Sequence, residues 1–187
     1  MIDQPATGTK PMVGTPWKEQ LAALIRLRPM KWLMAGGIRL VVPSHRIGVA
    51  LIAFNAEDEL LLLRHVFHPE TPWGLPGGWL ARHESPAEGL VREMREETNL
   101  TVTVGPPAYI AHQAGPSHLY MAYLGWVQPG PVTLSNEILE ARWFPLSELP
   151  QPEHPFTRPA ALAARSLLSI YSSPAEFADR TNLGDNK

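Results

Sequence analysis

Residues 78–100 read GWLARHESPAEGLVREMREETNL, and this stretch decides the fold because it predicts one helix with a defined start and two different faces. Ser85 can cap the helix, Pro86 suits the first helical position, and Glu88 completes a capping box with Ser85. At about 100° per residue, one face is predicted to pack on the body of the protein, and it consists of Ala87, Val91, Met94 and Thr98.

The other face of the predicted helix gathers acidic side chains. Glu93, Glu96 and Glu97 repel one another by a few tenths of a kcal/mol per pair, so the arrangement costs stability unless a cation compensates it. Their oxygen atoms suit Mg²⁺ or Mn²⁺, which share their remaining positions with water and phosphate oxygens. The alternative is a solvated helix in which Arg92 and Arg95 pair with these acids. The acidic face therefore predicts a divalent-metal site for a phosphate-bearing substrate.

The fixed positions around this helix resemble the signature of the Nudix hydrolase family. Gly78 is followed after five residues by Glu84, and after seven more by Arg92-Glu93-Met94-Arg95-Glu96-Glu97-Thr98-Asn99-Leu100. Only the glycine expected at position 99 is replaced. Asn99 ends the predicted helix, where a left-handed backbone is needed, and Asn adopts that conformation next best after Gly. We therefore expect this departure to change stability slightly and the chemistry hardly at all.

The resemblance implies the chemistry of the site. It implies Mg²⁺ or Mn²⁺ as the cofactor and hydrolysis of a pyrophosphate bond in a nucleoside diphosphate derivative, such as ADP-ribose or a nucleotide sugar. Bound dications lower the pKa of a coordinated water, and a carboxylate can take its proton. The metal ligands implied residue by residue are the carbonyl of Gly78 and the side chains of Glu93, Glu96, Glu97 and Glu137. The implied catalytic residues are Arg92, Glu93, Glu96 and Glu137, and the identity of the general base stays open.

Two charged residues near the acidic face have roles that the sequence leaves open. Arg92 is expected to orient glutamates rather than touch the substrate, because it can reach Glu88 or Glu96 one turn away. Glu84 precedes the helix, where its charge favours the positive end of the helix dipole. It is either a structural partner or a metal ligand.

Residues further along the chain suggest an additional acid near the metals and the kind of substrate. Residues 136–144 resemble the family segment that carries an additional acid near the metals, with Glu137 the first choice and Glu140 the second. Pro116 resembles a proline of the ADP-ribose-type members. A base is usually bound on an aromatic face, and the aromatic candidates are Phe67, Trp79, Tyr109 and Tyr120. Five histidines could meet phosphate, although each is more often structural: His65, His68, His83, His112 and His118.

The rest of the chain predicts a mixed α/β domain. Two apolar runs of strand length, 47–54 and 59–64, flank a turn and predict a buried hairpin. Further strands are predicted at 101–104, 109–112, 119–127 and 141–144, a short turn at 147–149, and a helix at 159–170. This order of elements resembles the Nudix fold, an α/β (α+β) architecture with a mixed β-sheet sandwiched between helices, over roughly residues 45–172.

Composition bounds the domain organisation. The 187 residues are 44% apolar, carry a net charge of −2 and include no cysteine, which suits one globular core without disulfides or thiolate metal sites. We expect an N-terminal extension at 1–44, a Nudix hydrolase domain at 45–172 and a polar, frayed C-terminal tail at 173–187. The first fifty residues carry a net charge of +5 and the remainder −7.

The extension is predicted to contain an amphipathic helix that starts at Thr15 and Pro16. It is expected to pack on its own domain or across a homodimer, and attachment to an anionic membrane is the alternative. Its apolar stripe consists of Trp17, Leu21, Leu24 and Ile25.

The sequence also separates classes of partner. It contains no run of eighteen uncharged apolar residues and no secretion pattern, so we expect a cytoplasmic protein without a membrane span. The acidic core domain disfavours a nucleic-acid partner, so the expected partner is a small nucleoside diphosphate derivative, with a homodimer as the candidate assembly. Two other functions stay open: a Nudix-like module that senses a nucleotide without hydrolysing it, and removal of pyrophosphate from RNA 5′ ends.

Overall fold

The computed structural model describes residues 45–113 and 118–182, together with positions 17, 32, 33, 37 and 41. The chain divides into two compact units, Met1–Ser44 and His45–Lys187, and the account below concerns the second. Pro116 lies outside the described residues. The same holds for the helix predicted in the N-terminal extension, except that Trp17 is described and helical.

Within the described part of the second unit, the strands form two sheets. The first has the order β4-β1-β6-β5 and is mixed, because β1 pairs parallel with β6 and antiparallel with β4. The second has the order β3-β2-β7 and is antiparallel. The elements are β1 (Arg46–Ala53), β2 (Glu59–His65), β3 (Trp73–Gly74), β4 (Gly77–Trp79), α3 (Pro86–Thr98), β5 (Val102–Gln113), β6 (His118–Val127), β7 (Ile138–Pro145), the 3-10 turn η1 (Leu146–Glu148), α4 (Thr157–Leu168) and α5 (Pro174–Asn182).

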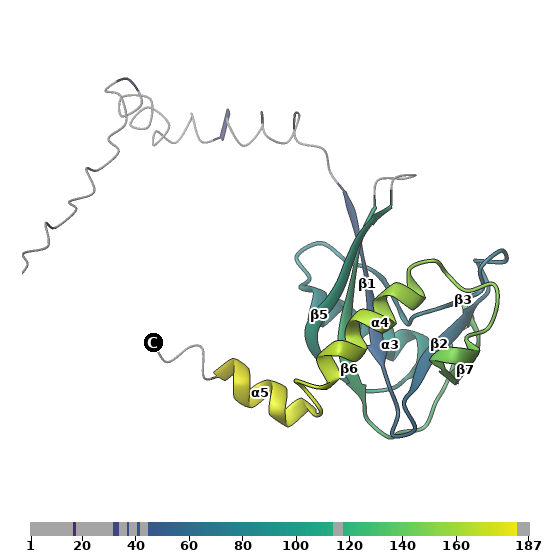
Figure 1. Ribbon diagram of the computed structural model, residues 1–187. Coiled ribbons are helices and arrows are strands. Elements are labelled where there is room, and N and C mark those ends of the chain that lie inside the picture. The colour runs from purple at the N-terminus through teal and green to yellow at the C-terminus, as the bar shows by residue number, and fades with distance from the viewer. Residues whose placement is uncertain are drawn as a thin grey trace, which may run out of the picture. The chain divides into compact units, whose positions relative to one another are not determined.

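Strand β1 lies at the centre of the fold because its two faces are buried against different helices (Figure 1). Alternate residues of a strand point to opposite faces. Val49 and Leu51 pack in one core cluster with the apolar side of α3, whereas Ala50 and Ile52 pack in a second cluster with the alanines of α4. The predicted fold class, a mixed sheet between helices, is therefore confirmed.

The acidic helix predicted from the sequence is α3, and both of its ends are as expected. Ser85 Oγ accepts a hydrogen bond from the N–H of Glu88 (3.3 Å), and Glu88 Oε2 accepts one from the N–H of Ser85 (2.9 Å), so the capping box is confirmed. Asn99 ends the helix in the left-handed conformation with a φ of 59°. Its N–H donates to the carbonyl of Arg95 (3.0 Å).

The buried face of α3 matches the predicted one only in part, because Met94 and Thr98 are buried as expected but Ala87 and Val91 are not. Leu90 and Met94 are fully buried, whereas Ala87 and Val91 are exposed. Helical periodicity fixes the angle between successive residues around the helix axis, but it does not determine which side of the helix faces the sheet. The helix is rotated so that Leu90 and Met94 point to the sheet, and this rotation also carries Glu97 inward, where it is buried.

Three expectations about the other elements were wrong. β1 and β2 do not form a paired hairpin: they belong to different sheets and are joined by an isolated bridge between Phe54 and Leu60 beside the turn. The segments 101–104 and 109–112 are one strand, β5, whose pairing with β6 shifts register on both sides of Pro107, because proline has no N–H for the ladder. The C-terminal segment is not frayed throughout, because it contains α5.

Helix α5 is held by aromatic contacts. The ring of Phe177 lies 5.4 Å from that of Tyr171 and 6.3 Å from that of Trp126, measured between centroids. These contacts give a polar segment an apolar anchor that its composition did not indicate. Among the described residues, the structure contains no helix with the length and apolar character needed to cross a membrane.

Candidate active site

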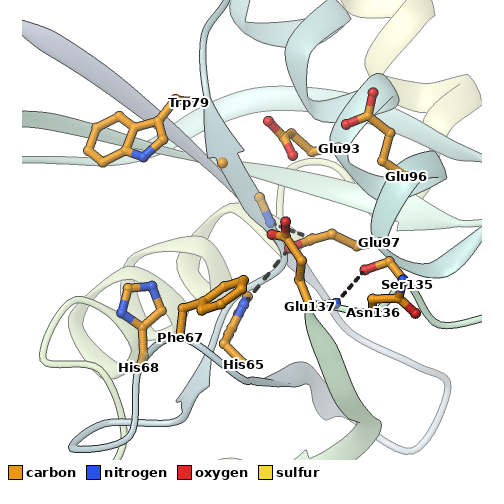
Figure 2. A pocket seen from close by; sticks show the side chains of 12 residues that line it. His65, Phe67, His68, Trp79, Glu93, Glu96, Glu97, Ser135, Asn136 and Glu137 are labelled. Carbon is orange, nitrogen blue, oxygen red and sulfur yellow. Dashed lines mark hydrogen bonds and ion pairs between the residues drawn. The ribbon is translucent and has the colours of Figure 1, made fainter.

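A cavity of about 540 Å³ lies where α3 faces β4 and the segment that leads into β7 (Figure 2). It is lined by all five residues that the sequence resemblance implied as metal ligands: Gly78, Glu93, Glu96, Glu97 and Glu137. Residues from distant parts of the chain therefore meet at one place. The other lining residues were not assigned to the metal site from the sequence, and they are Gly77, His65, Phe67, His68, Trp79, Ser135 and Asn136.

The two glycines before α3 are required by close approaches at this cavity. Gly77 has a φ of +144°, and a Cβ there would lie 2.1 Å from the carbonyl oxygen of Val49. A Cβ on Gly78 would lie 2.4 Å from Oε1 of Glu93. At position 77 a side chain would meet backbone that cannot yield, whereas at position 78 it would displace the carboxylate of Glu93. The turn therefore brings the β4 backbone against the acidic helix.

Arg92 holds three carboxylates together at the edge of the cavity. Its Nε and Nη2 donate to the two oxygens of Glu84 (2.8 and 3.0 Å), and its Nη1 donates to Glu93 (2.9 Å) and Glu96 (3.2 Å). Nη2 also donates to the carbonyl of Trp79 (3.1 Å). The expected contact with Glu96 is present, but the other contact goes to Glu84 instead of Glu88, which is engaged in the capping box.

The same contacts decide the role of Glu84. Its Oε2 also accepts the N–H of Ala81 (2.9 Å), and the hydrogen bonds from Arg92 and Ala81 hold the pKa of this carboxyl well below its usual range. The carboxylates of Glu84 and Glu93 in turn raise the pKa of Arg92. These contacts favour the structural alternative for Glu84, which binds Arg92 and does not line the cavity.

Glu97 is the most deeply placed acid of the cavity. Burial, together with the negative charges of Glu93, Glu137 and Glu96, raises its pKa to about 8, even though the Gly77 N–H donates to its Oε2 (3.0 Å). Burial also raises the pKa of Glu93. Without a bound cation Glu97 therefore keeps its proton near neutral pH, and a dication that binds here would displace this proton.

His65 faces Glu97 across the cavity, with Nδ1 4.0 Å from Oε1 (Figure 2). Burial and the nearby His68 and His154 lower the pKa of His65 to about 4. Because the pKa of Glu97 is raised and that of His65 is lowered, both groups are uncharged near neutral pH. The contact is therefore a pairing of neutral groups and not a salt bridge.

Glu137 reaches the cavity from the segment that precedes β7. The N–H of Ser135 donates to the carbonyl of Glu97 (3.0 Å), so this segment is joined to the end of α3. The carbonyl of Glu137 accepts the N–H of Val66 (2.9 Å). Glu140, the second choice for the additional acid, lies instead on β7 beside Arg64 (3.5 Å) and does not line the cavity.

The donor set fits a hard divalent ion. All the candidate ligand atoms are carboxylate or carbonyl oxygens, the ligand type of Mg²⁺ and Mn²⁺. A Cβ at position 78 would fill the space beside the Glu93 carboxylate. Among the described residues, no three His, Asp or Glu side chains are placed so that together they could hold a metal ion. The fit to a divalent ion therefore rests on the type of the oxygen ligands.

Some of the aromatic and histidine candidates line the cavity, and the others lie elsewhere in the domain. Phe67 and Trp79 line the cavity and are 69% and 42% exposed. Tyr109 instead packs on Phe156, with ring centroids 5.3 Å apart, and belongs to the core. Tyr120 lies beside Trp79 and is considered below. His65 and His68 line the cavity, whereas His83, His112 and His118 do not.

Comparison with known proteins identifies the family of this chain. A family model described as the NUDIX domain matches residues 44–164, which is more than half of the chain. The protein belongs to the Nudix family.

Its similarity to individual relatives is partial. It is 28% identical over 125 residues to the NAD-capped RNA hydrolase NudC of Vibrio parahaemolyticus, covering 65% of this chain and 47% of that relative. It is 37% identical over 62 residues to a MutT-like protein of Streptomyces ambofaciens, covering 33% of this chain and 39% of the relative. The chain thus spans less than half of the length of these curated relatives.

Solved structures show the same fold at low sequence identity. A UDP-X diphosphatase aligns with a TM-score of 0.62 at 18% identity, over 81% of this chain and 76% of the other. A NUDIX hydrolase from Nitrosomonas europaea aligns with a TM-score of 0.59 at 22% identity, over 66% and 90%. An ADP-ribose pyrophosphatase from Streptococcus suis aligns with a TM-score of 0.55 at 22% identity, over 67% and 92%.

Proposed function

We propose that this protein is a metal-dependent pyrophosphohydrolase that cleaves a pyrophosphate bond in a nucleoside diphosphate derivative. The observation that carries the proposal is the meeting of Glu93, Glu96 and Glu97 with Gly78 and Glu137 around one cavity. Family membership supports the same chemistry. The reaction adds water across one phosphoric anhydride bond and leaves two phosphate esters.

In this proposal some acids of the cavity bind the metal ion and others accept the proton of the attacking water. When bound, Mg²⁺ or Mn²⁺ would neutralise charge on the phosphate oxygens and lower the pKa of a coordinated water. The residues that would hold the ion are Glu93, Glu97 and the carbonyl of Gly78. The attacking water gives its proton to a carboxylate, for which we propose the exposed acids Glu96, 61% of whose side chain is exposed, and Glu137. Arg92 positions the acids and does not touch the substrate.

The direct test is a substrate screen read by product analysis. The purified chain would be incubated with ADP-ribose, nucleotide sugars, dinucleoside polyphosphates and nucleoside triphosphates, with Mg²⁺, with Mn²⁺ or with EDTA. The proposal expects two phosphate-bearing products from a nucleoside diphosphate derivative, formed only with metal. Failure to cleave any pyrophosphate compound with either ion would contradict it.

A second candidate comes from the names of the relatives. Several curated relatives are named NAD-capped RNA hydrolases, and both NAD and an NAD cap contain a pyrophosphate bond of the class proposed here. Adding NAD and a 5′-NAD RNA oligonucleotide to the screen separates these substrates. Cleavage of the RNA together with a steep loss of rate at rising salt would indicate that the chain binds the phosphate backbone.

A module that binds a nucleotide without hydrolysing it is the remaining alternative. It would bind ligand and yield no product with any ion. The acids of the cavity argue against a module of this kind. Burial of Glu97 among other carboxylates destabilises the folded protein unless a cation is bound.

A further inference from the structure

Three neighbouring strands carry an aromatic pair over a glycine at the same level of the first sheet. Gly48 on β1 is the register partner of Trp79 on β4 and of Tyr120 on β6. The ring centroids of Trp79 and Tyr120 lie 5.6 Å apart, with their planes at 44°. We call Trp79, Gly48 and Tyr120 the aromatic platform.

The platform depends on the missing side chain of Gly48. A Cβ there would lie 2.7 Å from two ring carbons of Tyr120 and 3.4 Å from a ring carbon of Trp79. The two rings therefore occupy the space directly above the β1 backbone. Any larger residue at position 48 would push the tyrosine ring away from the strand.

Trp79 and Tyr120 of the platform line a second cavity of about 160 Å³ that adjoins the acidic one. The two cavities lie side by side, because they share five lining residues: His65, His68, Gly77, Gly78 and Trp79. Their chemistry differs, because none of the described residues that line the second cavity is acidic. A group that enters it meets the rings of Trp79 and Tyr120, the hydroxyl of Thr71 and the imidazole of His154.

His154 supplies such a hydrogen-bonding group. Its Nδ1 accepts the N–H of Phe156 (3.3 Å), so the proton of the neutral ring is on Nε2, which is left as a donor. Burial lowers the pKa of His154, which keeps the ring neutral. Thr71, which also lines the second cavity, adds a hydroxyl that can donate or accept.

We propose that the aromatic platform binds the planar heteroaromatic ring of the substrate against the tilted rings of Trp79 and Tyr120, while the diphosphate lies in the acidic cavity. This inference rests on the proposed function and names the part of the substrate that the second cavity selects. A flat ring with hydrogen-bonding edges fits both the stacking faces and the polar groups of Thr71 and His154. A sugar has no planar π system, so the contact of its C–H groups with these rings would be weaker than that of a flat base.

Binding of neutral fragments tests the platform without hydrolysis or metal. Adenosine and uridine would be compared with ribose by calorimetry in EDTA, because these ligands carry no phosphate that the acids would repel. The parent is expected to bind at least one nucleoside about tenfold or more tighter than ribose, since stacking of a base contributes on that order. Equal binding of nucleosides and ribose would overturn the proposal.

Variants then assign the preference to the platform. Trp79→Leu and Tyr120→Leu should remove most of the preference, and Gly48→Ala should reduce it without deleting either ring. Leu162→Ala, at a 55% exposed position on α4, is the control and should bind like the parent. Circular dichroism would verify that each variant is folded. A Trp79→Leu protein that is folded and keeps the full preference would also overturn the proposal.

The kinetic arm distinguishes this inference from the proposed function. With a substrate that carries a heteroaromatic ring, Trp79→Leu should raise KM roughly tenfold to a hundredfold and change kcat much less. If the parent cleaves pyrophosphate compounds but no nucleoside preference exists, only the platform proposal fails. If nucleosides are preferred but nothing is cleaved, the proposed function fails and the platform stands.

Discussion

The N–H of Gly77 donates a hydrogen bond to Oε2 of Glu97 at 3.0 Å, which joins the β4 turn to the most deeply buried acid of α3. Gly77 needs a positive φ to make this approach, and Glu97 is oriented into the cavity by it. The contact therefore sets the position of the acid that we expect to be essential.

Replacing Glu97 by Gln should remove most of the hydrolytic activity and leave the fold intact. The amide side chain retains an oxygen that can accept the Gly77 N–H, but it lacks the negative charge that a dication requires. We expect a loss of kcat of about a hundredfold or more, on the order seen when a group essential to the chemical step is removed. Turnover and circular dichroism would be measured beside Glu148→Gln, an acid on η1 outside the cavity. Turnover close to that of the parent at saturating Mg²⁺ would rule out Glu97 as an essential ligand.

Metal should raise the melting temperature of the parent protein. An ion that binds the folded acidic cluster and not the unfolded chain stabilises the folded state by mass action. We expect millimolar Mg²⁺ or Mn²⁺ to raise the midpoint in thermal unfolding, and Glu97→Gln to reduce that increase. An unchanged midpoint with both ions would argue against a metal site at this cavity.

The stability of the metal-free protein should depend on pH through Glu97. Its pKa is about 8 in the folded protein and 4.5 for the unperturbed group, so between these values the folded state holds a proton that the unfolded state has released. The free energy of unfolding therefore falls as pH rises through this window, by at most about 1.4 kcal/mol per unit of pKa difference. The contribution of His65, with a folded pKa of about 4, has the opposite sign between pH 4 and 6.5.

The variant separates these two contributions. Urea unfolding of the parent and of Glu97→Gln would be measured in EDTA from about pH 5 to 8.5, the range that brackets the titration of a folded group with a raised pKa. His65 titrates in both proteins, so its effect largely cancels in the difference. We expect Glu97→Gln to become increasingly more stable than the parent as pH rises. A difference that does not change with pH would show that Glu97 titrates near its ordinary value.

Arg92→Lys should impair catalysis although the charge is kept. The planar guanidinium binds both oxygens of Glu84 and also reaches Glu93 and Glu96, whereas a lysine ammonium cannot make a two-pronged contact of this kind. We expect kcat to fall about tenfold or more with a smaller change in KM, because the residue positions the acids. Glu84→Gln should show a weaker effect of the same kind. Equal kinetics for Arg92→Lys and the parent would refute a positioning role.

Asn99→Gly should stabilise the protein by about 0.5 kcal/mol, because Asn99 adopts a φ of 59°, which glycine reaches without the steric cost that a Cβ imposes. Asn99→Ala is the opposite control and should destabilise by about 1 kcal/mol. Both would be measured by urea unfolding. Loss of activity in Asn99→Gly would contradict our expectation that this position affects stability and not chemistry.

The local features of the sequence predicted the acidic helix well. The capping box of Ser85 and Glu88 and the left-handed end at Asn99 depend on contacts within a few residues, so the sequence alone determines them. The face of the helix that packs on the sheet depends on the rest of the fold. For that reason Val91 was expected to be buried and is exposed, while Glu97 is buried.

The parts of the site that come from distant segments could not be predicted in the same way. His65 and His68 carry no spacing that marks a site, and they line the cavity only because β2 ends beside α3. The absence of a paired hairpin between β1 and β2 has the same origin. Strand β1 pairs with β4 and β6, whereas β2 pairs with β3 and β7. A signal for the platform was present in the aromatic residues, but the register that aligns Trp79, Gly48 and Tyr120 is set by strand pairing.

The backbone bonds between the segment before β7 and the end of α3 have a consequence for motion. The N–H groups of Thr133 and Ser135 donate to the carbonyls of Thr98 and Glu97, so the segment that carries Glu137 is fastened to the last turn of the helix. Local opening of that turn would break both bonds at once, while the Val66 N–H still holds the carbonyl of Glu137. In hydrogen exchange, the amides of Thr133 and Ser135 should then open as one cooperative unit with the end of α3.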